Sequence, residues 1–184
     1  MRPKTPRLAP SNPADYSDEQ AQLAGGRGNP RGELNIVRLL VQHPALYRHY
    51  FQFAMHLIAA SSLAPREREI IILHTCALCG DKYDMAQHRV IAQRAGLSTA
   101  DIEAAIHDGA CLSDFECTLL KAAEELVREQ CIADATYAAL AERYTPRQLL
   151  DFVFTVGNYT LMAMTTRTFD VQKEADVEGG WKPG

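Results

Sequence analysis

The spacing of hydrophobic and polar positions from Glu33 onward is that of amphipathic helices, with no stretch of alternating β-branched residues between hairpin turns. The pattern therefore predicts an all-α domain. We expect helices over residues 33–42, 44–60, 65–79, 81–95, 99–107, 114–130, 135–144 and 146–169.

Residues that favour helix ends support most of these boundaries. Three prolines, at 44, 65 and 146, fall in expected first turns, where the missing amide hydrogen does no harm. Glycines 80, 96 and 109 follow expected C-termini. Ser98 with Asp101, and Ser113 with Glu116, resemble capping boxes. The apolar run 70–73 could be a buried strand, but the charged residues 66–69 before it favour a helix.

Residues 1–32 contain five of the nine prolines and four of the eleven glycines, with few large apolar side chains. We interpret them as an N-terminal arm that is flexible or wraps a partner, followed by a domain over residues 33–171 and a tail over residues 172–184. The tail contains the one tryptophan, Trp181, which suits a docking anchor or a disordered segment better than a catalytic role.

Composition excludes several classes of protein. The 19 Lys and Arg residues against 23 Asp and Glu give a net charge of −4, which argues against a nucleic-acid partner. No apolar run is long enough to span a membrane, and the first residues lack the apolar segment of a signal peptide, so we expect a soluble, cytoplasmic protein. Five cysteines in a chain of this length argue against a disulfide framework, and no second cysteine or histidine cluster with zinc spacing is present.

The densest cluster of reactive groups lies between Pro65 and Gly96. A helix starting near Asp81 would place Asp81, Asp84 and His88 on one face, and Glu69 from the preceding helix is a natural partner for His88. A carboxylate beside a histidine suits a general acid/base near neutral pH. Each residue also has an ordinary explanation: Asp81 as an N-cap, Asp84 as a first-turn charge, and the other two as unreactive surface or core groups.

Cys76 and Cys79 form a C-x-x-C pair. At a helix N-terminus this would indicate redox chemistry, but the pair falls in the last turn of an expected helix, where the dipole disfavours a thiolate. Inert, redox-active and metal-binding roles all stay open. The other three cysteines, at 111, 117 and 131, have no comparable partners, and His74 is a reserve candidate for a site residue.

The cluster resembles the carboxymuconolactone decarboxylase family of the alkylhydroperoxidase-like superfamily. The resemblance lies in L-x-x-R-E-R-E at residues 63–69, in the spacing of Tyr83, Asp84 and His88, and in Ala-Gly-Leu-Ser at 95–98. The runs LLKAAEELVRE (119–129) and VGNYTLMAM (156–164) extend it over roughly residues 33–171. It implies a bundle of about seven to eight helices, a trimeric or hexameric homo-oligomer, and a site that needs no cofactor.

The alkylhydroperoxidase branch has a glutamate, eleven residues, C-x-x-C, three residues and a histidine. On this sequence Glu69 and His88 match, but both thiol positions are aspartates, 81 and 84. The resemblance therefore favours the decarboxylase branch and a small anionic ring or lactone substrate. It implies proton transfer by His88, orientation of His88 by Glu69, pocket polarity from Asp84 and Tyr83, and a substrate carboxylate held by Arg68 or Arg89. The alternatives are a thiol-dependent antioxidant enzyme using Cys76 and Cys79, and a non-catalytic helical binder.

Overall fold

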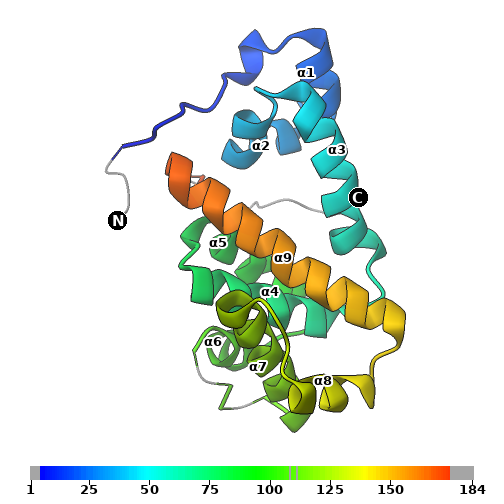
Figure 1. The fold of residues 1–184 in the computed structure, drawn as a ribbon. Coiled ribbons are helices and arrows are strands. Elements are labelled where there is room, and N and C mark those ends of the chain that lie inside the picture. Colours follow the sequence, from blue (N-terminus) through cyan, green and yellow to red (C-terminus); the bar gives the residue numbers. More distant parts are fainter. Residues whose placement is uncertain (1–4, 108, 111, 175–184) are drawn as a thin grey trace. The chain divides into compact units, whose positions relative to one another are not determined.

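The computed structural model describes residues 5–107, 109–110 and 112–174, and Figure 1 shows that it is helical throughout. Nine α-helices and no strand occur in these residues, which confirms the predicted all-α class. The chain divides into two compact units. We refer to residues 60–164 as the central unit, and to residues 1–59 with 165–184 as the terminal unit.

The terminal unit contains α1 (Asp18–Leu23), α2 (Asn35–Leu40) and α3 (Pro44–Met55), with 3₁₀ turns at Pro13–Asp15 and Pro30–Glu33. A π-helical turn, His56–Ala60, follows α3, where the sequence predicted one continuous helix to Ala60. The buried core consists of small or aromatic side chains from both sides of residue 32: Tyr16, Ala21, Ala24, Val37, Val41 and Tyr47.

The expected N-terminal arm is therefore partly folded within its described residues. Ser17 caps α1 through a capping box with Gln20, and the Tyr16 hydroxyl donates a hydrogen bond to the Gly32 carbonyl over 3.1 Å. Alanines and a single tyrosine supply the buried surface here, so a search for large apolar side chains does not find it. The end of the tail, including Trp181, and Cys111 lie outside the described residues.

The central unit is built around α4 (Pro65–Cys79), which contacts α5 (Lys82–Arg94), α6 (Thr99–Ile106) and α7 (Asp114–Glu129). The remaining helices are α8 (Asp134–Ala141), which packs on α7, and α9 (Pro146–Phe169), which begins in this unit. Every residue from Glu69 to Cys76 is buried, because neighbours surround α4. This burial on all sides explains its apolar run, and it makes residues 70–73 helical as predicted.

Helix ends in the central unit follow the predicted signals. Both α4 and α9 have the predicted bounds, and Gly80 ends α4 in the left-handed conformation, at φ 65°. Asp81 is the N-cap of α5, and Ser98 and Ser113 cap α6 and α7 with reciprocal capping boxes. None of the described helices is long and apolar enough to cross a membrane.

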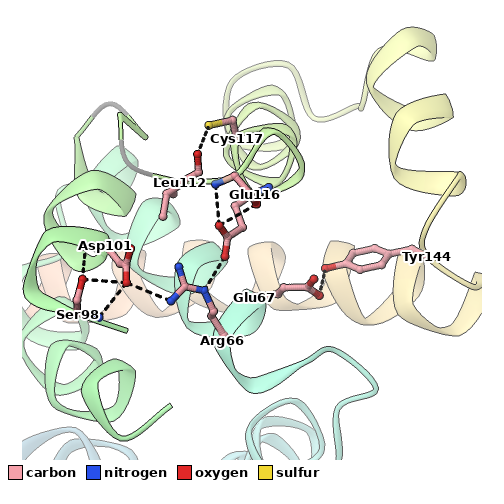
Figure 2. A network of polar contacts seen from close by, with 9 residues as sticks. Arg66, Glu67, Ser98, Asp101, Leu112, Glu116, Cys117 and Tyr144 are labelled. Carbon is pink, nitrogen blue, oxygen red and sulfur yellow. Dashed lines mark hydrogen bonds and ion pairs between the residues drawn. The ribbon is translucent and has the colours of Figure 1, made fainter. Parts of the chain in front are cut away.

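A charged network joins the first turn of α4 to the N-termini of α6 and α7 (Figure 2). Arg66 donates to Glu116 over 2.7 Å and to Asp101 over 3.1 Å. Each carboxylate also accepts hydrogen bonds from the capping serine of its own helix. Arg66 therefore fixes the start of α4 against two helix N-termini.

Candidate functional site

Glu69 and His88 meet in the interior of the central unit. The Nδ1 atom of His88 lies 2.7 Å from Oε2 of Glu69, and the two residues are 6% and 1% exposed. With the carboxylate ionised, Nδ1 carries the ring proton and donates a hydrogen bond to Glu69, which leaves Nε2 as the basic nitrogen. The structure thus brings together the two residues that the sequence paired across a spacing of 19.

Tyr159 of α9 completes a three-residue chain. Its hydroxyl oxygen lies 2.9 Å from Nε2 of His88, and the two rings meet edge to face with centroids 4.9 Å apart. Given the tautomer set by Glu69, the Tyr159 hydroxyl is the donor to Nε2. Both ring nitrogens of His88 are therefore hydrogen-bonded, and we refer to Glu69, His88 and Tyr159 as the relay.

Sequence reasoning did not assign a role to Tyr159, although it lies in the VGNYTLMAM run. It is separated from His88 by 71 positions, so no local spacing connects the two. The sequence signal is a hydroxyl-bearing aromatic between two polar residues, Asn158 and Thr160, in the otherwise apolar run 156–164.

Arg68 contacts the relay, and the candidates Asp81, Tyr83 and Asp84 lie at the start of α5. Arg68 donates from Nε to Oε1 of Glu69 over 3.2 Å, and its side chain is 13% exposed. Asp81 is buried, and its Oδ1 accepts the amide hydrogens of Tyr83 and Asp84, so its N-cap interpretation is confirmed. Asp84 and Tyr83 are buried on the first turn of α5, the helix that carries His88.

The two cysteines of the C-x-x-C pair differ in their surroundings. Cys76 is fully buried, and its pKa is raised well above the usual value, first by burial and then by the nearby carboxylates of Asp84 and Asp81. Cys76 also belongs to the same apolar cluster as Tyr159. Cys79 is half-buried, with its Sγ 3.9 Å from the Thr160 hydroxyl. A buried thiol among carboxylates is a weak nucleophile because its reactive form is the anion.

The candidates Arg89 and His74 have hydrogen-bond partners outside the relay. Arg89 forms a two-pronged ion pair with Glu103 of α6, and both side chains are about two-fifths exposed. His74 is buried, and its Nδ1 lies 2.8 Å from the Ala105 carbonyl oxygen. Burial lowers the pKa of His74, so it is a neutral core residue near pH 7. Among the described residues, no group of three His, Cys, Asp or Glu side chains is placed to hold a metal ion.

Comparison with protein families finds one match, over the part of the chain that holds Glu69 and His88. Residues 44–128 match the model of the carboxymuconolactone decarboxylase family. The predicted resemblance is confirmed. This carboxymuconolactone decarboxylase-like region contains Glu69 and His88, whereas Tyr159 lies beyond its end. No curated protein matches the chain significantly.

Solved structures with the same fold cover almost the whole chain. A peroxidase-related protein with an alkylhydroperoxidase AhpD core, from Ralstonia eutropha JMP134, is 17% identical, with a TM-score of 0.79 and 96% of each chain covered. A peroxidase-related protein from Silicibacter sp. TM1040 is 15% identical, with a TM-score of 0.79 and 98% and 99% covered. The debrominase Bmp8 is 17% identical, with a TM-score of 0.71 and 94% of each chain covered. At these identities the likeness shows a shared fold alone.

Proposed function

We propose that this protein is a carboxymuconolactone decarboxylase-like enzyme that releases carbon dioxide from a small, anionic lactone acid by acid–base chemistry, without a cofactor. The observation that carries the proposal is the buried contact of 2.7 Å between His88 Nδ1 and Glu69 Oε2. A histidine held by a buried carboxylate has a defined tautomer and a stabilised imidazolium, which are the properties of a general acid/base.

Decarboxylation of a lactone acid needs a proton at a defined carbon. When the bond to the carboxylate breaks, its electron pair moves into the conjugated lactone carbonyl and carbon dioxide leaves. The ring carbanion then takes a proton that originates from the imidazolium of His88, which is recharged from solvent. Glu69 stabilises the imidazolium and fixes the ring, so the proton is available only along Nε2.

Arg68 is the better of the two arginines for the substrate carboxylate. Its guanidinium is hydrogen-bonded to Glu69 of the relay, whereas Arg89 is paired with Glu103. A guanidinium can hold a carboxylate by two parallel hydrogen bonds, which orients the bond that breaks. We assign Tyr83 and Asp84 to the polarity of the substrate cavity, since both are buried one turn before His88.

The surroundings of Cys76 and Cys79 do not favour the thiol-dependent alternative. A peroxidase needs a thiolate beside its proton donor, and the positions that would supply it next to Glu69 and His88 are Asp81 and Asp84. The existing pair has one fully buried thiol with a raised pKa.

The test is turnover of carboxymuconolactone in D₂O, followed by carbon dioxide release and deuterium at the protonated ring carbon. We expect His88→Gln to lower the rate by about 10²- to 10⁴-fold, and the double variant Cys76→Ser, Cys79→Ser to keep it. Undiminished turnover by His88→Gln would remove this site from the proposal. Peroxide reduction that is lost with the cysteines would replace decarboxylation by the antioxidant function. Light scattering on the same preparation tests the expected trimer or hexamer.

A further inference from the structure

The hydrogen bonds of His88 restrict how it can exchange a proton with a substrate. Nδ1 is bonded to Glu69 over 2.7 Å and Nε2 to Tyr159 over 2.9 Å. An imidazole has two ring nitrogens and no other site for a proton. A substrate atom can therefore reach Nε2 only by displacing the Tyr159 hydroxyl, or it can exchange its proton through that hydroxyl.

Packing holds Tyr159 in place. The residue is 3% exposed, its ring lies edge to face on the His88 ring, and it packs with Ile72 and Cys76 of α4. Displacing the hydroxyl would require moving a buried aromatic ring out of a cluster that includes two fully or almost fully buried side chains. Transfer through the hydroxyl leaves the ring in place and uses the hydrogen bond between Tyr159 and Nε2 that is already formed.

We propose that Tyr159 is the catalytic acid that delivers the proton to the substrate carbon, and that His88 acts through it. The hydroxyl proton of Tyr159 passes to the ring carbanion left by carbon dioxide, and the Nε2 proton of the His88 imidazolium passes to the phenolate oxygen. His88 is left neutral beside the Glu69 carboxylate until solvent returns one proton. One proton enters and one carbon dioxide leaves per turnover, so the step balances. This assignment rests on the proposed decarboxylation and adds a residue from α9 to it.

A second buried tyrosine provides a matched control. Tyr144 is 5% exposed, its hydroxyl donates to Glu67 over 2.8 Å, and its ring meets Phe115 edge to face. Tyr144→Phe and Tyr159→Phe each remove one hydroxyl that is hydrogen-bonded to a polar side chain, from a ring that is itself buried, and the bond of Tyr144 is the less buried of the two. Only Tyr159 contacts His88.

The experiment compares both variants with the unmodified protein and with His88→Gln, using carboxymuconolactone. We expect Tyr159→Phe to lower kcat by at least about 10²-fold with a smaller change in KM, and Tyr144→Phe to stay within about twofold. In mixtures of H₂O and D₂O, the rate of the unmodified protein should depend non-linearly on the deuterium fraction because two protons move together. The residual rate of Tyr159→Phe should depend on it linearly. A structural role for Tyr159 would not change the form of this dependence.

The outcomes separate this inference from the proposed function. A Tyr159→Phe protein that keeps its kcat, while His88→Gln loses it, overturns the role of Tyr159 and leaves the proposed function standing. An unmodified protein that leaves the lactone acid unchanged overturns the proposed function and the proton step together. As a readout that needs no substrate, Tyr159→Phe should shift the ¹⁵N resonance of His88 Nε2, and an unchanged resonance would overturn the hydrogen bond itself.

Discussion

The charged network around Arg66 and the relay around His88 both start on α4, from side chains three residues apart. In the network, Arg66 faces two carboxylates that also accept hydrogen bonds from capping serines, and its side chain is 36% exposed. In the relay, one carboxylate 1% exposed holds an imidazole whose second nitrogen is bonded to a neutral hydroxyl. The network fixes opposite charges at a partly solvated helix junction, whereas the relay holds an imidazole between a carboxylate and a hydroxyl in the interior. Both clusters are rich in hydrogen bonds. They differ in the groups around the cation or imidazole, which are two carboxylates for Arg66 and one carboxylate with one hydroxyl for His88.

The largest effect should follow from removing the charge of the relay. Glu69→Gln keeps an oxygen that can accept from Nδ1 but no longer stabilises the imidazolium, so we expect decarboxylation to fall by about 10²- to 10⁴-fold. Glu103→Gln is the control, because Glu103 pairs with Arg89 on a partly exposed surface. The steady-state rate of decarboxylation is measured for both variants. Equal rates for Glu69→Gln and the unmodified protein would show that the carboxylate has no part in proton transfer.

Breaking the network should cost stability and leave the rate alone. Arg66→Met keeps most of the apolar stem but leaves Asp101 and Glu116 without their cation, and we expect a loss of about 1–2 kcal/mol in the free energy of unfolding after allowance for solvent. Arg128→Met removes an exposed pair with Glu124 and should change it by at most about 0.5 kcal/mol. Urea unfolding measures both. A loss of turnover at unchanged stability would contradict the separation of the two regions.

Acid should weaken the fold in two steps. Burial lowers the pKa of His74 from 6.5, so the unfolded chain binds that proton more readily and stability declines as the pH falls below 6.5. The hydrogen bond from Arg66 lowers the pKa of Asp101 from 3.8 to about 2, so its contribution is present above pH 3.8 and is lost as the pH falls toward 2. Thermal unfolding as a function of pH tests this. His74→Gln should remove the first step. Asp101→Asn should reduce the second, to which Glu103 and Glu125 also contribute because hydrogen bonds from Arg89 and from the Ala133 amide lower their pKa values. A profile that both variants leave unchanged would refute this prediction.

Much of the fold could be predicted because its signals are local. Pro65 and Gly80 bound α4, and the pairs Ser98 with Asp101 and Ser113 with Glu116 mark helix starts. The site could be predicted only in part. Glu69 and His88 lie on consecutive helices, so helical periodicity brings them together, and the structure does so.

The parts of the site and fold that could not be predicted depend on contacts between residues far apart in the sequence, which local spacing does not indicate. Tyr159 of α9 joins the relay through a hydrogen bond to His88 of α5, a contact between residues 71 positions apart. The charged residues 66–69 indicated a helix, but not that the partners of Arg66 come from α6 and α7. Tyr16, Ala21 and Ala24 give the N-terminal region a core too small to stand out in composition.

The complete burial of Cys76 next to Tyr159 has a practical consequence. A thiol reagent can modify Cys76 only when the interior opens, whereas the exposed Cys117 and Cys131 are accessible in the closed protein. The labelling rate of Cys76 therefore measures how often the region around the relay opens. Any compound that binds in that region and holds it closed will lower the labelling rate of Cys76. Unknown ligands can therefore be found by the protection of this native cysteine from a thiol reagent.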